Sequence, residues 1–173
     1  MEPKYATFWP RFFAGFIDFL VLMPISFIQD YIIRSHQTIG IVSWLIVSML
    51  MYYVYDIYFH AKFGQTLGKM VMKVKLMDIS ETRIVSFKQA LLRESVPLAL
   101  TIMLLPYEIM KVLNGTSYLF HPVHPDKVPT DIITQILMYV ELGWVILEVV
   151  TMAFNSKRRA VHDFIAGSVV VRV

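Results

Sequence analysis

The sequence has no cysteine and few charged residues, and each shortage excludes a class of protein. Without cysteine among its 173 residues, the chain can form neither a disulfide nor a thiolate metal site. Charged residues make up 17% of the chain and hydrophobic residues 57%, with a mean hydropathy of +0.59. Soluble domains carry about 25% charged residues. This balance predicts a membrane protein. The net charge of +3 is spread between apolar stretches, so nucleic acid is not an expected partner.

Four apolar stretches have about the length needed to cross a hydrocarbon core of ~30 Å. They are residues 12–33, 39–59, 95–113 and 131–154, within a single domain of residues 1–173. Segments 60–93 and 155–173 are more polar and contain two strand-like runs, 70–76 and 168–173, that we expect to pair. The expected fold is therefore an all-α membrane protein of four transmembrane helices with a small, cytoplasmic, β-hairpin-like cap.

The basic residues predict the orientation of these helices. With four spans, 13 of the 16 Lys and Arg residues fall on the side that holds both termini and segment 60–93. Positive charge is retained on the cytoplasmic side of a membrane. We therefore expect a multi-pass protein of a bacterial inner membrane, with both termini in the cytoplasm.

Acidic residues inside the spans are the first candidates for function, because a charge is costly in the hydrocarbon core. Counting along the helices places Asp18 roughly 10 Å deep and Glu148 roughly 9 Å deep from the same side. Glu141 lies one heptad farther out on the face of Glu148, and Asp56 lies near the interface. Such a ladder of carboxylates is suited to exchanging protons for monovalent cations.

The alternative is a structural charge network that locks the helices together. Arg11 lies two turns before Asp18 on the same helical face, with Gly15 between them leaving room for a partner. A bidentate contact between Arg11 and Asp163 would fasten the tail to the first helix. Arg93 and its neighbour Glu94, where a short helix meets the third span, complete the expected network.

A glycine-bearing motif follows the second span. It comprises Gly64, Gln65, Thr66, Leu67, Gly68 and Lys69. It has three residues between its glycines where a phosphate-binding loop has four, and Met70 stands where that loop needs Ser or Thr, so nucleotide hydrolysis is excluded. We expect a tight turn that allows close backbone approach.

No enzyme, cofactor or metal site is expected. His162 beside Asp163 is a possible acid–base pair, but no nucleophile accompanies it. His121, His124 and Asp126 lie in a proline-containing loop and are interpreted as solvated residues.

Three stretches together resemble the RDD family of bacterial membrane proteins, which is named for one arginine and two aspartates. They are residues 8–18 (Phe-Trp-Pro-Arg-Phe-Phe-Ala-Gly-Phe-Ile-Asp), the motif at 64–69, and residues 159–171, which begin Arg-Ala-Val-His-Asp. The resemblance maps the named residues onto Arg11, Asp18 and Asp163. It implies a membrane protein, and some members of the family have been proposed to be sodium–proton antiporters.

Two functions remain open from the sequence. The first is a transporter or channel-like antiporter for protons and monovalent cations, working as a homo-oligomer or alone in the lipid bilayer. The second is a structural or accessory protein that scaffolds other membrane proteins.

Overall fold

The computed structural model describes residues 3–34, 37–114 and 132–173. The elements, in chain order, are η1 (Pro3–Tyr5), α1 (Phe8–Arg34), α2 (Thr38–Phe63), α3 (Leu67–Val71), β1 (Val74–Asp78), α4 (Phe87–Arg93), α5 (Ser95–Leu113), α6 (Ile132–Phe154), α7 (Val161–Ala166) and β2 (Ser168–Arg172).

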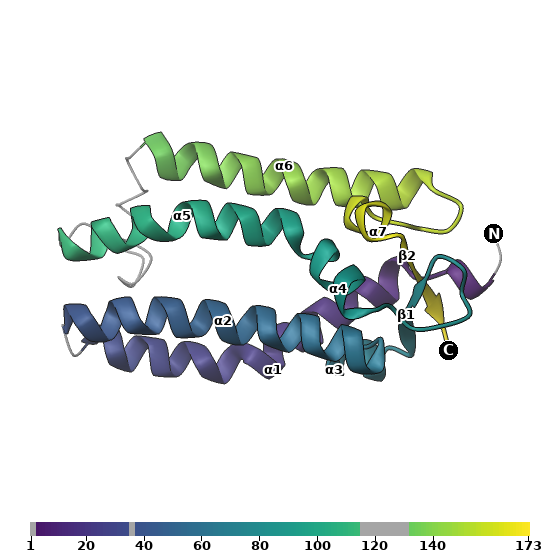
Figure 1. Ribbon diagram of the computed structural model, residues 1–173, viewed down its shortest axis with the longest axis horizontal. Helices are drawn as coiled ribbons and strands as arrows, with labels where there is room; N and C mark the ends of the chain where they lie inside the picture. Colours follow the sequence, from purple (N-terminus) through teal and green to yellow (C-terminus); the bar gives the residue numbers. More distant parts are fainter. Residues whose placement is uncertain (1–2, 35–36, 115–131) are drawn as a thin grey trace.

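Among the described residues, four helices are long and apolar enough to cross a membrane, as the sequence predicted. These candidate spans are Phe8–Gln29, Thr38–Phe63, Ser95–Leu113 and Ile132–Phe154. Their large apolar side chains are mostly exposed on the protein surface, which fits a surrounding of lipid. In Figure 1 the four helices run side by side, with α1 and α2 along one edge and α5 and α6 along the other.

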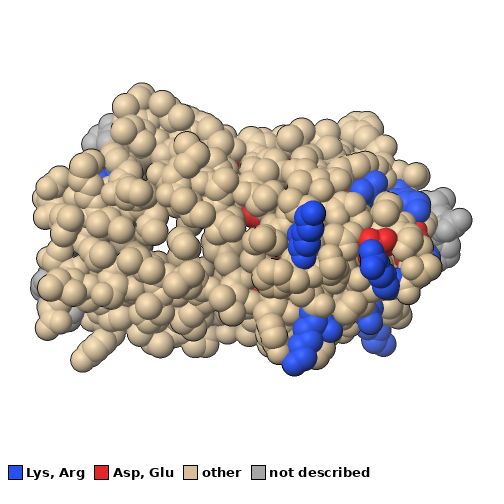
Figure 2. Space-filling view, in the orientation of Figure 1, with Lys and Arg blue, Asp and Glu red and all other residues tan. Residues whose placement is uncertain are grey.

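The remaining elements gather at one end of the bundle, where both termini also lie (Figure 1). We call η1, α3, β1, α4, α7 and β2 the cap. Lys and Arg side chains are concentrated over this end, whereas the surface over the spans is nearly free of them on the face shown in Figure 2. The uneven distribution of Lys and Arg along the sequence thus places these residues mainly at one end of the folded protein.

The two strands pair antiparallel, as expected, with Leu76 opposite Val170 at the centre of the register. They are joined through α4, α5, α6 and α7, so the sheet is not a local hairpin. Val74, Leu76 and Val170 pack with Tyr53 and Ile57 of α2 in a buried cluster. The end of the second span and the sheet therefore share one core.

The predicted strand at 70–76 is partly wrong, because α3 occupies Leu67–Val71 and β1 begins at Val74. Thr66 caps α3, accepting a hydrogen bond from the backbone N–H of Lys69 through its side chain. The amide of Gly68 is also bonded, to Asp18. These contacts satisfy amides at the start of a short helix and favour it over an extended chain.

Candidate functional site

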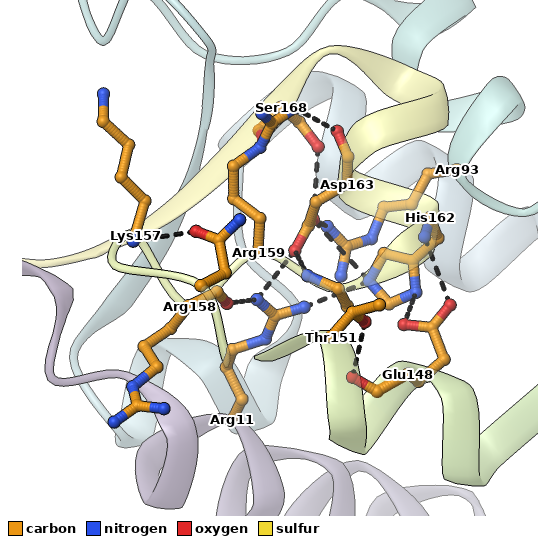
Figure 3. Close-up of polar contacts among 12 residues, drawn as sticks. Arg11, Arg93, Glu148, Thr151, Lys157, Arg158, Arg159, His162, Asp163 and Ser168 are labelled. Atoms are coloured by element: carbon orange, nitrogen blue, oxygen red, sulfur yellow. Dashed lines mark hydrogen bonds and ion pairs between the residues drawn. The ribbon is translucent and has the colours of Figure 1, made fainter. Parts of the chain in front are cut away.

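Asp163 joins three parts of the chain. It lies in the first turn of α7, where its Oδ2 accepts a hydrogen bond from the backbone N–H of Ala160. Arg11 of α1 places Nη1 at 2.7 Å from that oxygen, and Arg93 of α4 forms an ion pair with Oδ1 (Figure 3). The Asp163 side chain is completely buried. Burial acts to raise its pKa, but the charges of Arg11 and Arg93 hold the pKa of Asp163 well below its usual range. The predicted contact between Arg11 and Asp163 is present, but it is not bidentate, because Arg93 holds the second carboxylate oxygen.

His162 carries the network on to the fourth span. Its Nε2 lies 3.1 Å from Nη2 of Arg11, which can only donate, so Nε2 accepts. The ring proton is then left on Nδ1, which faces Oε2 of Glu148 at 2.8 Å. Glu148 also accepts a hydrogen bond from the backbone N–H of His162 through Oε1. Burial, reinforced by the charge of Arg93, lowers the pKa of His162 and favours this neutral form.

Asp18 has partners other than the one expected from its helical face. Its Oδ1 accepts hydrogen bonds from the hydroxyl of Tyr55 and the backbone N–H of Gly68, each at 2.7 Å. Its Oδ2 accepts from the hydroxyl of Thr66 at 2.6 Å. Arg11 instead turns toward Asp163. Asp18 therefore binds the first span to the second and to α3.

The glycine motif works as a structural connector, as predicted. Gly64 ends α2 with φ +68°, and a Cβ there would lie 2.8 Å from the carbonyl oxygen of Leu76. Gln65 donates a hydrogen bond to the carbonyl of Val74. A Cβ on Gly68 would collide with the backbone of α1, at the carbonyl of Ala14. Each glycine permits a close backbone approach that any side chain would prevent.

A second network of polar side-chain contacts connects Lys69, His60 and Asp56. Its Nζ lies 2.5 Å from Nε2 of His60, whose Nδ1 lies 2.8 Å from Oδ2 of Asp56. Burial, together with the nearby Arg93, lowers the pKa of Lys69 to about 8. Burial and the charge of Asp56 raise the pKa of Glu94 to about 8. At neutral pH the Glu94 carboxyl therefore holds a proton.

Several of these groups line one cavity of about 780 Å³ between the spans. Its acidic and basic lining residues are Arg11, Asp18, Asp56, Lys69, Arg93, Glu94, Glu148 and His162. The remaining wall is largely apolar and comes mainly from α1 and α6, including Phe19, Met23 and Val145. In Figure 2 the surface over the spans is hollowed, and acidic atoms are visible at the side of the hollow toward the cap.

The expected ladder of acids is formed only in part. Asp18, Asp56 and Glu148 line the cavity, whereas Glu141 is exposed and is not among the residues that line it. Heptad spacing alone placed Glu141 with Glu148, but only Glu148 is buried and lines the cavity. His121, His124 and Asp126 lie outside the described residues.

The sequence analysis missed Tyr55 and His60, which hold two of the cavity acids. The spacing of Asp56 and His60, one helical turn apart, could have indicated the second contact. The contact of Tyr55 with Asp18 had no such signal, because it joins different helices.

Four apolar helices, a charged cavity between them and a cap fastened by buried ion pairs define a small multi-pass membrane protein. The RDD family matches residues 5–167, and the chain belongs to that family. It is 24% identical to the uncharacterized membrane protein YteJ of Bacillus subtilis (strain 168), over 96% of this chain and 80% of that protein. No solved structure shows significant similarity to this chain.

Proposed function

We propose that the protein exchanges protons for a monovalent cation through the cavity between its spans. The observation that carries this proposal is the gathering of four acids, Asp18, Asp56, Glu94 and Glu148, around one cavity in a membrane protein. Ionisable groups facing the interior of a helical bundle are the usual elements of ion and proton pathways.

The contacts divide these acids by role. Asp18 accepts three hydrogen bonds and is fully engaged in holding the cap, so it is poorly suited to releasing its donors for an ion. Asp56 and Glu94 are better suited, because their charges interact and the pKa of Glu94 is raised to about 8. Loss of the Glu94 proton adds a negative charge beside Asp56, which a monovalent cation can neutralise.

Glu148 is the second candidate for exchange. Its carboxylate faces neutral His162, so the two groups can take up one proton between them without moving a buried arginine. A proton entering from the cap would meet His162 before Glu148. This pair offers a step between the cap and the cavity.

The test is reconstitution in liposomes with a lumenal pH dye, under gradients of sodium, lithium or potassium. Glu94→Gln and Glu148→Gln should abolish cation-dependent pH change while the protein still elutes as a folded species and unfolds cooperatively at the assay pH. No flux in a well-folded wild type would overturn the proposal.

A matched pair of glycine variants tests the cavity itself. Gly15 and Gly143 both lie in spans with no atom within 4 Å of an added Cβ, but only Gly15 lines the cavity. Gly15→Phe should block flux by filling the cavity, and Gly143→Phe should not. Equal flux in the two variants would place the pathway elsewhere.

A structural role is the second candidate, and the saturation of Asp163 favours it. Asp163 joins α7 to the first span through Arg11 and to α4 through Arg93, and each of its two carboxylate oxygens is in an ion pair. In this role neutralising the cavity acids lowers stability or assembly, and no flux exists to lose. Cross-linking in membranes would show whether the partner is another copy of this chain or a different membrane protein.

The orientation is part of the proposal. The concentration of Lys and Arg at the cap supports a cytoplasmic cap with both termini on that side, in the inner membrane if the source is bacterial. Labelling of single cysteines placed in the cap, in intact cells, would test it.

A further inference from the structure

Each short helix of the cap exposes large apolar side chains and buries a polar side chain or backbone polar groups. In α4, Phe87 is 64% exposed and Leu91 and Leu92 are also exposed, whereas the arginine that ends the helix, Arg93, is only 5% exposed. A helix on a water-exposed surface shows the reverse arrangement. The surroundings of α4 are therefore not those of an ordinary soluble surface.

The other two short helices repeat this arrangement. Leu67, Met70 and Val71 of α3 are exposed, while its buried face is the glycine backbone that bonds Asp18. In α7, Phe164 and Ile165 are exposed, while Asp163 is completely buried. Three helices from different parts of the chain share the same inverted arrangement.

The sheet of the cap has buried apolar residues and exposed basic residues, as expected for a surface in water. Val74 and Leu76 are buried, and the basic residues Lys73 and Arg172 at its end are exposed. In Figure 1 the sheet lies beyond α4 and α7, next to the chain termini. The exposed surface of the cap is therefore apolar over the short helices and polar at the end of the sheet.

We propose that α3, α4 and α7 lie in the interfacial layer of the bilayer, with their exposed apolar residues against lipid acyl chains. The apolar surface of the spans continues directly onto them, through exposed Phe63 just before α3 and exposed Phe154 before α7. Apolar faces of this kind insert about 5–10 Å into the boundary between headgroups and acyl chains.

Basic residues on or next to these helices suit lipid headgroups. Lys88 of α4 and Lys62, near the end of α2, are exposed beside these apolar residues, and the guanidinium of Arg159 lies 4.1 Å from the ring centre of Phe164. Long basic side chains extend from an apolar level to the phosphate level. The occupant of this surface is thus the membrane itself, with a preference for anionic headgroups. The inference depends on the membrane assignment and is independent of transport.

The absence of cysteine makes a direct test simple. Val71→Cys, Phe87→Cys and Ile165→Cys each introduce a single thiol for a nitroxide spin label at an exposed position. Ile146→Cys, in the exposed face of α6, gives the lipid reference, and Thr82→Cys, in the turn after β1, gives the water reference. Each labelled protein is reconstituted in vesicles of phosphatidylcholine and phosphatidylglycerol.

Collision with oxygen and with a water-soluble nickel chelate then identifies the surroundings of each label. The proposal expects high oxygen and low nickel accessibility at all three sites, like Ile146 and unlike Thr82. Nickel accessibility equal to that at Thr82 would overturn it by placing the helices in water. Low accessibility to both reagents would also overturn it, because that result shows a protein contact in place of lipid. Using three positions on three helices keeps the test valid if one variant misfolds.

Discussion

Nη1 of Arg11 lies 2.7 Å from Oδ2 of Asp163, which fastens the start of the first span to the short helix that follows the fourth. Arg93 holds the other oxygen of the same carboxylate. Both arginine side chains are nearly inaccessible to solvent. Two cations thus share one anion inside the protein, and this arrangement makes the stability of the cap depend on a single residue.

Asp163→Asn should destabilise the protein strongly. The substitution leaves the buried Arg11 and Arg93 without their anion, which typically costs about 3–5 kcal/mol. Thermal unfolding in detergent, followed by circular dichroism, would measure the loss. Glu81→Gln is the control, because Glu81 pairs with Lys4 and Lys157 at the outer side of the cap, where a pair contributes about 1 kcal/mol or less. Equal losses in the two variants would contradict the dominant role of Asp163.

Gly68→Ala should prevent correct docking of α3. The added methyl group collides with the carbonyl of Ala14 and comes within 2.9 Å of the Asp18 carboxyl carbon. Since the obstacle is backbone, the structure must shift. Gly15→Ala is the matched control in the same region, where no atom lies within 4 Å of the new Cβ. Size-exclusion elution and melting temperature should change for Gly68→Ala and stay near wild type for Gly15→Ala.

Thr66→Val should lower stability by about 1–3 kcal/mol, because it leaves Asp18 Oδ2 without its donor and removes the cap of α3. Thr66→Ser keeps the hydroxyl and should retain most of the stability. Chemical denaturation of both variants would give the difference. A serine variant as unstable as the valine variant would contradict this, because it would show that losing the methyl group costs as much as losing the hydrogen bonds.

Stability should reach a minimum near pH 8. The pKa of Glu94 is raised to about 8, so between about pH 4.5 and 8 this group binds more protons in the folded than in the unfolded state, and its contribution to stability falls as pH rises. Below about pH 6.5 the lowered pKa of His162 acts in the opposite sense, so the fall is expected between about pH 6.5 and 8. The pKa of Lys69 is lowered to about 8, so between about pH 8 and 10.5 the folded state binds fewer protons, and stability rises again. Melting temperatures measured from pH 5 to 10 would reveal the minimum.

Two variants separate the branches of that profile. Glu94→Gln should flatten the acidic branch, and Lys69→Met should flatten the alkaline branch. A profile unchanged by both substitutions would assign the pH dependence to other groups.

The sequence was sufficient to predict the spans, the pairing of the two strand regions and the contact of Arg11 with Asp163. These follow from hydropathy, alternation and the need of a buried charge for a partner. The partners of Asp18 could not be predicted, because one of them is the backbone N–H of Gly68, which no side-chain pattern reveals. Helical spacing also failed for Glu141, since burial of a helix face depends on neighbouring helices that a count along one helix does not include.

The antiparallel pairing of β1 with β2 has a consequence for biogenesis. β1 follows the second span, whereas β2 and Asp163 follow the fourth, so the sheet and the ion pairs of Arg11 and Arg93 cannot form until all four spans have been synthesised. Until then both arginines lack the anion that neutralises them. The cap can therefore be completed only after every span has been synthesised, and a chain interrupted before α7 lacks the anion that both arginines need.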